Sequence, residues 1–302
     1  MEGKTFYSLI AIIILLLLFF SYWFIPYNTT EFNASPNSNF SLNNSENNSL
    51  QFYSNMRFSE TNLSYRIEDC PLQRTNDMSW AFNIISDTTI LNFFPVEDRQ
   101  EITITCDDAN KFEGNLFIAG EGGPTNITVA GKFNIIESGK ILLIKDSDCE
   151  RPNVALHELL HVLGFDHSKN PKNIMYEISR CDQTMGEDII DFINEIYSIP
   201  SQPDLLFENT SVLMHGKYLD INFSIRNNGI KDSEESVVKI IADGKEVKEI
   251  EIPKIEIGYG REIYITNIWI RQINVQNIEF IIENNFDELS KTNNQVMFEI
   301  KK

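Results

Sequence analysis

Hydrophobic and polar positions along the 302-residue chain fall into four regions with different periodicities. From Phe6 to Ile25 there is no Asp, Glu, Lys, Arg or His, and a helix of this length covers the roughly 30 Å hydrocarbon core of a bilayer. We therefore predict a transmembrane helix within residues 1–27. Lys4 before it and the aromatic cluster at its far end predict a cytoplasmic N-terminus. A cleavable signal peptide is the alternative, but its apolar region is usually shorter.

Residues 28–55 are rich in Asn and Ser and show no sustained helical or strand period. This composition predicts a flexible stalk that holds the rest of the chain off the membrane. Five of its Asn residues begin an N-x-Ser/Thr acceptor triplet. Such triplets agree with an external location, but an Asn/Ser-rich tract also produces them by chance.

Residues 56–200 carry both helical and strand patterns, a helix first and then strands, which predicts a first folded domain. Apolar residues at helical spacing between 78 and 85 precede a series of strand-like runs. The runs are Thr89–Phe94, Glu101–Thr105, Asn126–Ile136 and Lys140–Lys145. We expect a loop at residues 120–124 and a turn at Ser138–Gly139.

Beyond Pro203 the pattern changes to short strands in which apolar and polar residues alternate. Asn228–Gly229 and Asp243–Gly244 mark turns between them. About seven strands in roughly 100 residues predict an all-β, immunoglobulin-like sandwich over residues 203–302. The region carries no nucleophile, base or metal cluster, so a spacer or protein-binding role is predicted.

Composition narrows the function classes. Hydrophobic residues make up 42% and charged residues 23% of the chain, which is typical of a folded globular protein. The formal charge of −19, from 25 basic and 44 acidic residues, would repel nucleic-acid phosphates. No nucleic-acid partner is therefore predicted.

The cysteines lack the CxxC spacing of a zinc ribbon or a thioredoxin-like motif. They are Cys70, Cys106, Cys149 and Cys181. Outside the cytosol they are expected to form two disulfides, for which the sequence alone permits three pairings. The alternative is four buried thiols.

The candidate chemistry lies in the segment Asn153–Ser168. Asn153 is a candidate N-cap, and the leucines that follow define one apolar face, so a helix is predicted. His157 and His161 are then one helical turn apart. Their i, i+4 spacing lets both imidazoles bind a single Zn²⁺.

Gly164 is predicted to end this helix, because glycine adopts the left-handed conformation at low cost, and His167 can then return as a third ligand. A water molecule takes the fourth position, and Glu158 is the candidate general base that moves its proton to the leaving amine. The alternative is an amphipathic helix that carries histidines by chance. Three of the four histidines of the chain occupy the required positions, which favours zinc, and His215 stands outside the pattern.

The motif His157-Glu158-x-x-His161-x-x-Gly164-x-x-His167 resembles the metzincin metallopeptidases, and the Ser that follows it is similar to the matrixin branch. Met175 resembles the Met-turn of the family, which would form a hydrophobic floor beneath the metal; ordinary core filling is the alternative. The resemblance implies an α+β metzincin-like catalytic domain with a mixed sheet and zinc-dependent hydrolysis of protein or peptide substrates. By analogy, an edge strand within Asn126–Ile136 would pair with an extended substrate.

The sequence also departs from the family pattern. No further histidines are available for a second, structural zinc, so one catalytic zinc is expected, and calcium is neither indicated nor excluded. The stalk lacks the cysteine of a blocking prosegment. Glu177 replaces the matrixin-like Pro after the Met-turn, and Ile178 is the candidate wall of the specificity pocket. The resemblance implies the disulfide pairs Cys149–Cys181 and Cys70–Cys106.

Short motifs in the last hundred residues resemble the cell-adhesion-related CARDB domain. They are Pro203-Asp204-Leu205, Arg226-Asn227-Asn228-Gly229, Asp243-Gly244, and Glu288 with Thr292-Asn293-Asn294. The complete prediction is a single-pass protein of the cell membrane whose zinc endopeptidase and CARDB domains lie outside the cell, the latter with a surface protein or glycan as partner. The alternative is a surface adhesion protein with an inactive peptidase-like domain, which the intact ligands and Glu158 disfavour.

Overall fold

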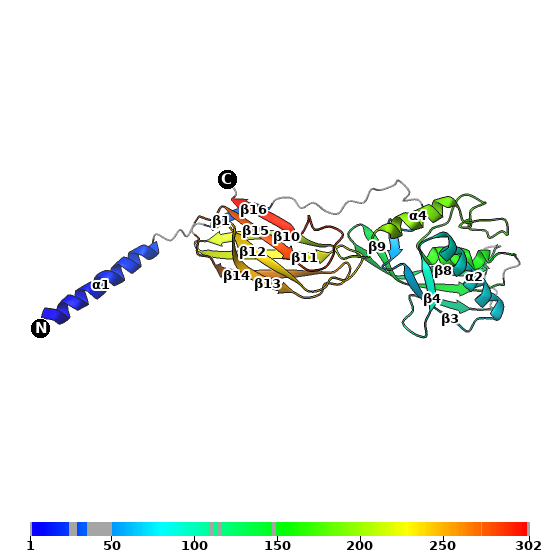
Figure 1. Ribbon diagram of the computed structural model, residues 1–302, viewed down its shortest axis with the longest axis horizontal. Helices are drawn as coiled ribbons and strands as arrows, with labels where there is room; N and C mark the ends of the chain where they lie inside the picture. The colour runs from blue at the N-terminus through cyan, green and yellow to red at the C-terminus, as the bar shows by residue number, and fades with distance from the viewer. Residues whose placement is uncertain are drawn as a thin grey trace.

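The computed structural model describes residues 2–23, 29–34, 50–108, 112–113, 116–146, 149–272 and 274–300. The described residues form a helix α1 (Glu2–Trp23), an α+β domain from residue 50 to 198, and a β-sandwich from residue 205 to 300. The sandwich lies between α1 and the α+β domain (Figure 1). Two predicted domains are therefore present, in the predicted order along the chain.

Helix α1 covers residues 6–23 of the segment for which the sequence predicts a membrane span. Within the part of the chain that the structure describes, no helix meets the length and apolarity needed to cross a membrane. The predicted transmembrane helix is therefore not confirmed.

The predicted stalk is wrong at both of its described ends. Strand β1 (Thr29–Ala34) pairs antiparallel with one strand of the sandwich on each side, and its Phe32 side chain is buried. At the other end, Phe52 N donates to Gly164 O and Asp166 N donates to Leu50 O. Six residues with one buried side chain are too short a pattern to stand out in sequence, because the neighbouring strands supply the hydrogen bonds. Residues 35–49 lie outside the described part.

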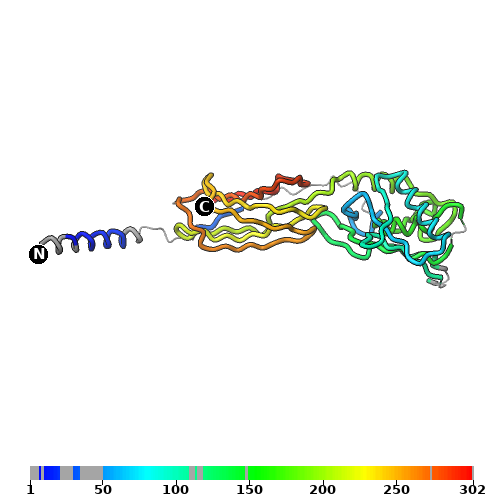
Figure 2. Tube along the Cα trace, turned by 60° about the horizontal axis from the view of Figure 1, so that its bottom comes forward, coloured from blue at the N-terminus to red at the C-terminus, as the bar shows by residue number. Residues whose placement is uncertain are grey.

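The blue trace of β1 lies among the last strands of the chain (Figure 2). The sandwich therefore includes a segment from before the α+β domain as well as the segment after it. The prediction that residues 28–55 form a stalk separate from the sandwich at 203–302 is therefore wrong for β1, which lies between β10 and β16 in one sheet.

A mixed sheet forms the centre of the α+β domain, in the order β2-β9-β5-β3-β4. Strands β2 and β5 pair with different stretches of β9, and β8 pairs with β9 along its whole length. The strand bounds are β2 (Met56–Phe58), β3 (Asn62–Glu68), β4 (Asn92–Pro95), β5 (Ile102–Cys106), β6 (Phe112–Glu113), β7 (Leu116–Phe117), β8 (Gly120–Ala130) and β9 (Phe133–Leu143). The long strands run parallel except β8, which is antiparallel to β9. This is the mixed sheet that the family resemblance implies.

Three helices pack on this sheet: α2 (Leu72–Thr88), α3 (Asn153–Val162) and α4 (Glu187–Ser198). Their buried faces include Met78 and Phe82 of α2, Leu159 of α3 and Ile193 of α4, which share one hydrophobic core. Apolar residues at helical spacing thus form the core as predicted.

The hairpin β8–β9 differs from its prediction. Its turn lies at Gly131, which has a φ of 55°, whereas the predicted turn at Ser138–Gly139 falls inside β9. A Cβ at Gly139 would lie 2.5 Å from Val162 Cγ1, so this glycine permits close approach of α3. Residues 120–124, predicted as a loop, belong to β8.

The sandwich confirms the predicted all-β second domain. Its strands are β10 (Leu205–His215), β11 (Tyr218–Asn227), β12 (Ser236–Ala242), β13 (Lys245–Ile252), β14 (Gly260–Trp269), β15 (Asn277–Glu283) and β16 (Gln295–Ile300), with β1 between β10 and β16. Alternate residues of these strands are buried, as in β11, and form a core of aliphatic and phenylalanine side chains.

Two disulfides connect the segments that surround the helices α2 and α3. Cys70–Cys106 joins the chain before α2 to the end of β5, and Cys149–Cys181 joins the chain before α3 to a later loop. These are the pairs that the family resemblance implies. Disulfides of this kind indicate a location outside the reducing cytosol.

Candidate metal centre

Helix α3 carries two of the predicted ligands. His157 and His161 lie on the same side of the helix, one turn apart, and both side chains are buried. The prediction that Asn153 caps α3 is wrong, because Pro152 occupies the N-cap position. Asn153 Nδ2 instead donates to Arg180 O at 2.7 Å. The Asn153 side chain thus ties the start of the helix to the loop that contains Cys181.

Gly164 ends the helical segment as the sequence predicts. Its φ of 95° is in the left-handed region, and its N–H donates to His161 O at 2.9 Å. The chain then reverses, with the buried Phe165 inside the core. This turn brings His167 back to the two histidines of the helix.

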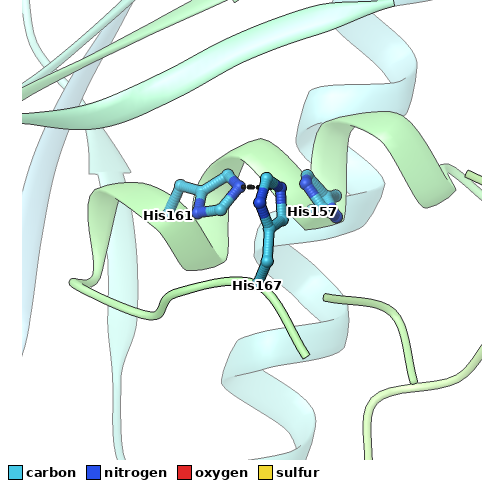
Figure 3. A group of neighbouring side chains, drawn as sticks. All are labelled: His157, His161 and His167. Atoms are coloured by element: carbon cyan, nitrogen blue, oxygen red, sulfur yellow. Dashed lines mark hydrogen bonds between the residues drawn. The ribbon is translucent and has the colours of Figure 1, made fainter. Parts of the chain in front are cut away.

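The three imidazoles converge on one point (Figure 3). One ring nitrogen from each of His157, His161 and His167 lies within 4.8 Å of the others, and the Nε2 atoms of His161 and His167 are 3.2 Å apart. Two nitrogens bound to one tetrahedral Zn²⁺ at about 2.0–2.1 Å are themselves about 3.3 Å apart. The cluster therefore has the donor atoms and the spacing of a zinc site.

The other ring nitrogen of the two buried histidines is held by a backbone carbonyl. His157 Nδ1 lies 2.7 Å from Ile174 O, and His161 Nδ1 lies 2.8 Å from Phe165 O. When Nδ1 donates to a carbonyl, Nε2 is left with the lone pair that a metal needs. Burial lowers the pKa of both rings, that of His161 to about 4, which favours the neutral ligand form.

The segment with the predicted Met-turn is joined to the histidine motif by backbone hydrogen bonds. Met175 is 1% exposed, its N–H donates to Asn173 Oδ1 at 2.8 Å, and its carbonyl accepts from Ser168 N at 2.7 Å. The preceding residue, Ile174, supplies the carbonyl that holds His157. The segment therefore contacts both His157 of α3 and Ser168, the residue after His167.

Glu158 of α3 is buried against the first residues of strand β8. A Cβ at Gly120 would lie 2.8 Å from Glu158 Oε1, and one at Gly122 would lie 2.4 Å from Glu158 O, so only glycine lets the strand approach this closely. Burial, with a contribution from Glu121, raises the Glu158 pKa to about 8. A divalent cation held by the histidines would lower this pKa, because a nearby positive charge favours the ionised carboxylate.

A cleft of about 580 Å³ opens above the histidines. Its walls are residues 118–122, helix α3 and residues 177–179, so Glu177 and Ile178 both line it. The strand segment beside the cleft is the start of β8, earlier than the predicted Asn126–Ile136. A larger hollow of about 830 Å³ on the sandwich has no histidine or cysteine among its described lining residues. The smaller cleft is therefore the candidate active site, because its lining residues include the three histidines and Glu158.

One aromatic residue at the centre escaped the sequence analysis. Phe52, in the predicted stalk, stacks on His161 with ring centroids 5.5 Å apart. Its N–H holds Gly164 O, which fixes the segment against the turn that returns His167. No periodicity or motif marks residue 52, because a single aromatic residue in a polar tract has no pattern.

Comparison with protein-family models agrees with this geometry. Residues 57–198 match the family model described as Matrixin. The chain contains a matrixin domain. Residues 202–298 match the model described as CARDB, so a CARDB domain follows the matrixin domain, as the short sequence motifs predict. The three histidines are the zinc-binding cluster of a matrixin metalloendopeptidase domain.

Proposed function

We propose that the protein is a zinc-dependent endopeptidase located outside the cytosol, with one catalytic zinc held by His157, His161 and His167. The observation that carries this proposal is the convergence of three imidazole nitrogens beside a buried carboxylate in an open cleft. When bound, Zn²⁺ supplies a Lewis acid that lowers the pKa of a water molecule to about 7 and polarises a carbonyl group.

Glu158 is the proposed general base. It adjoins His157 on α3, and its buried side chain lines the same cleft. Its carboxylate takes a proton from the water that attacks the peptide carbonyl and delivers that proton to the departing amine. Met175 is proposed to support the histidines from below, because its turn holds His157 through the Ile174 carbonyl.

Strand β8 is the proposed docking edge for the substrate. Within the described residues, it pairs with β9 only, so the backbone groups of its other edge are available to a peptide. An extended peptide that adds to this edge passes the histidines, because residues 118–122 line the cleft. Ile178 is the proposed side wall of the pocket that receives a substrate side chain.

The decisive variant is Glu158→Gln, which keeps the shape of the side chain and removes the base. Hydrolysis of a peptide library is expected to fall about 10²–10⁴-fold, while zinc content stays at one ion per chain. Glu97→Gln, at an exposed position of the same domain, is the matched control and should retain wild-type turnover. Wild-type turnover by correctly folded Glu158→Gln would remove Glu158 from the mechanism.

We also propose that residues 6–25 attach the protein to a membrane, with the N-terminus in the cytoplasm. The absence of charged residues in this segment and the exposure of its apolar side chains between Ile10 and Phe20 support the proposal. The test compares the full chain with a variant that lacks residues 6–25. Equal recovery of both in the soluble fraction would refute the attachment.

A further inference from the structure

The residues that flank the turn of the β8–β9 hairpin pack against the CARDB domain, while the turn residues Gly131 and Lys132 are themselves exposed. Ala130 and Phe133 at the turn, and Ile135 beyond it, form an apolar cluster with Ile230 of the sandwich, and all four are at most 1% exposed. Partly buried residues from the linker and the sandwich complete the cluster, namely Ile199, Ile257 and Leu289. This contact between the domains is therefore closed to water like a core.

The backbones of the two domains also fit closely at this contact. Ser59 Oγ donates to Ile230 O at 2.7 Å. A Cβ at Gly258 of the sandwich would lie 2.5 Å from Val129 O, and one at Gly131 of the hairpin would lie 2.9 Å from Asn228 Cβ. Each domain thus provides one glycine where a side chain would push the other domain away.

The same hairpin extends from this contact to the catalytic centre. Strand β8 is paired with β9 from Gly120↔Leu143 at one end to Ala130↔Phe133 at the other, with register shifts between Pro124 and Ile127. Its first residues pack on Glu158 and line the cleft. One hydrogen-bonded ribbon therefore connects the sandwich with the strand edge beside the histidines.

The chain path adds a second constraint. Strand β1, which precedes the matrixin domain, is paired within the sandwich, and β10 re-enters the sandwich directly after that domain. The matrixin domain is thus inserted between two segments of the sandwich. A passive spacer requires neither this insertion nor a buried contact with the substrate strand.

We propose that the CARDB domain positions strand β8, and thereby the extended substrate, through the contact of Ile230 and Gly258 with the hairpin turn. The inference rests on the proposed peptidase function. Ile230 and Gly258 act through β8 and are positioning residues. Because an edge strand holds an extended peptide through backbone hydrogen bonds, a shifted β8 would bind substrates that pair along it less tightly.

The test compares Gly258→Ala with Gly244→Ala in the full chain. Both glycines have similar positive φ angles, 74° and 76°, so both variants carry the same backbone penalty. A Cβ at Gly244 meets nothing within 4 Å, whereas at Gly258 it meets the backbone of the hairpin. Only Gly258→Ala therefore pushes on β8.

Two substrates are needed: a long peptide that can pair along β8, and a short peptide that reaches only the histidine cluster. For Gly258→Ala we expect KM for the long peptide to rise about tenfold, roughly the effect of one lost hydrogen bond, with KM for the short peptide and the zinc content unchanged. Gly244→Ala should match wild type on both peptides. Ile230→Ala should repeat the selective effect, and Ile230→Val should restore most of the loss.

Equal losses on both peptides together with lost zinc would overturn the inference, because they indicate general damage to the fold. An unchanged KM for the long peptide in both Gly258→Ala and Ile230→Ala would overturn it as well. A wild-type chain that hydrolyses neither peptide would remove the proposed function itself, and that outcome is distinct from an active wild type with unaffected variants.

Discussion

The two domains use their buried polar side chains in opposite ways. In the matrixin domain, one ring nitrogen of His157 and one of His161 contact a backbone carbonyl, and the other nitrogen of each ring lies close to His167. In the CARDB domain, the side-chain amide of the fully buried Asn227 makes all of its hydrogen bonds to backbone groups. Its Nδ2 donates to Lys231 O and Ile255 O, and its Oδ1 accepts from Asp204 N and Gly229 N.

This difference separates a reactive motif from a structural one. Both motifs are short and polar, and both are recognisable in sequence. A side chain whose donors and acceptors are all hydrogen-bonded inside the fold has none left for a ligand. A histidine that is hydrogen-bonded through one ring nitrogen keeps the other ring nitrogen for a metal. The Asn-Gly motif of the sandwich therefore stabilises a turn, and the histidine motif binds a metal.

The largest expected effect is that of metal removal. Treatment with a zinc chelator should reduce hydrolysis by about 10³-fold or more, because several kcal/mol of transition-state stabilisation are lost. Added Zn²⁺ should restore the activity. Thermal unfolding followed by tryptophan fluorescence should show a destabilised matrixin domain, since ligand binding stabilises only the state that binds. Full activity at a chelator concentration that strips the metal would contradict the metal-centre assignment.

The next largest effect is expected from Asn227→Ala in the sandwich. Loss of four hydrogen bonds at about 1 kcal/mol each should lower the free energy of unfolding by about 4 kcal/mol. Asn222→Ala is the matched control in the same strand, because Asn222 Oδ1 is buried without a hydrogen-bond partner in the described structure. Denaturant unfolding measures both. If the two variants lose equal stability, Asn227 has no special structural role.

The same variant distinguishes the two classes of motif. Zinc bound to Asn227→Ala should remain at one ion per chain, because no ligand to the metal is altered. His161→Ala should show the reverse, with weakened zinc binding and a stable sandwich. Loss of zinc in Asn227→Ala would contradict this distinction, because the structural motif of the sandwich would then also affect metal binding.

The sequence was sufficient for the parts of the centre that are local. His157, His161, Gly164 and His167 lie within eleven residues, so helix periodicity and one glycine turn determine their arrangement. The carbonyls of Ile174 and Phe165 could not be predicted, because every residue has a carbonyl and its direction depends on the folded chain. Phe52 was missed for a related reason, since its contact with His161 spans more than a hundred residues.

Glycines limited the prediction of the sheet. Gly131 and Gly139 are equivalent in sequence, but one provides a positive φ at a turn and the other provides room for Val162. Only the packed structure distinguishes these uses. In the sandwich, alternation predicted β11 well, whereas β1 is a strand only because β10 and β16 flank it.

The smallest effect concerns pH and the sandwich. Burial, with a contribution from Glu288, raises the Asp204 pKa from 3.8 to about 6. The folded state therefore binds this proton more tightly than the unfolded state, so its stabilising contribution is complete below about pH 4 and is lost as the pH rises through 6. The shift corresponds to at most about 3 kcal/mol.

Asp204→Asn should remove this pH dependence, because an amide cannot titrate but its oxygen can still accept from Asn293 Nδ2. The free energy of unfolding, measured by denaturant titration at several values between pH 4 and 7, should fall with pH in wild type and less steeply in the variant. Asp287→Asn, at an exposed position beside Glu288, should keep the wild-type slope. Equal slopes in all three proteins would show that burial does not disfavour the charged form of Asp204. The sandwich would then differ from the matrixin domain, where burial raises the pKa of Glu158.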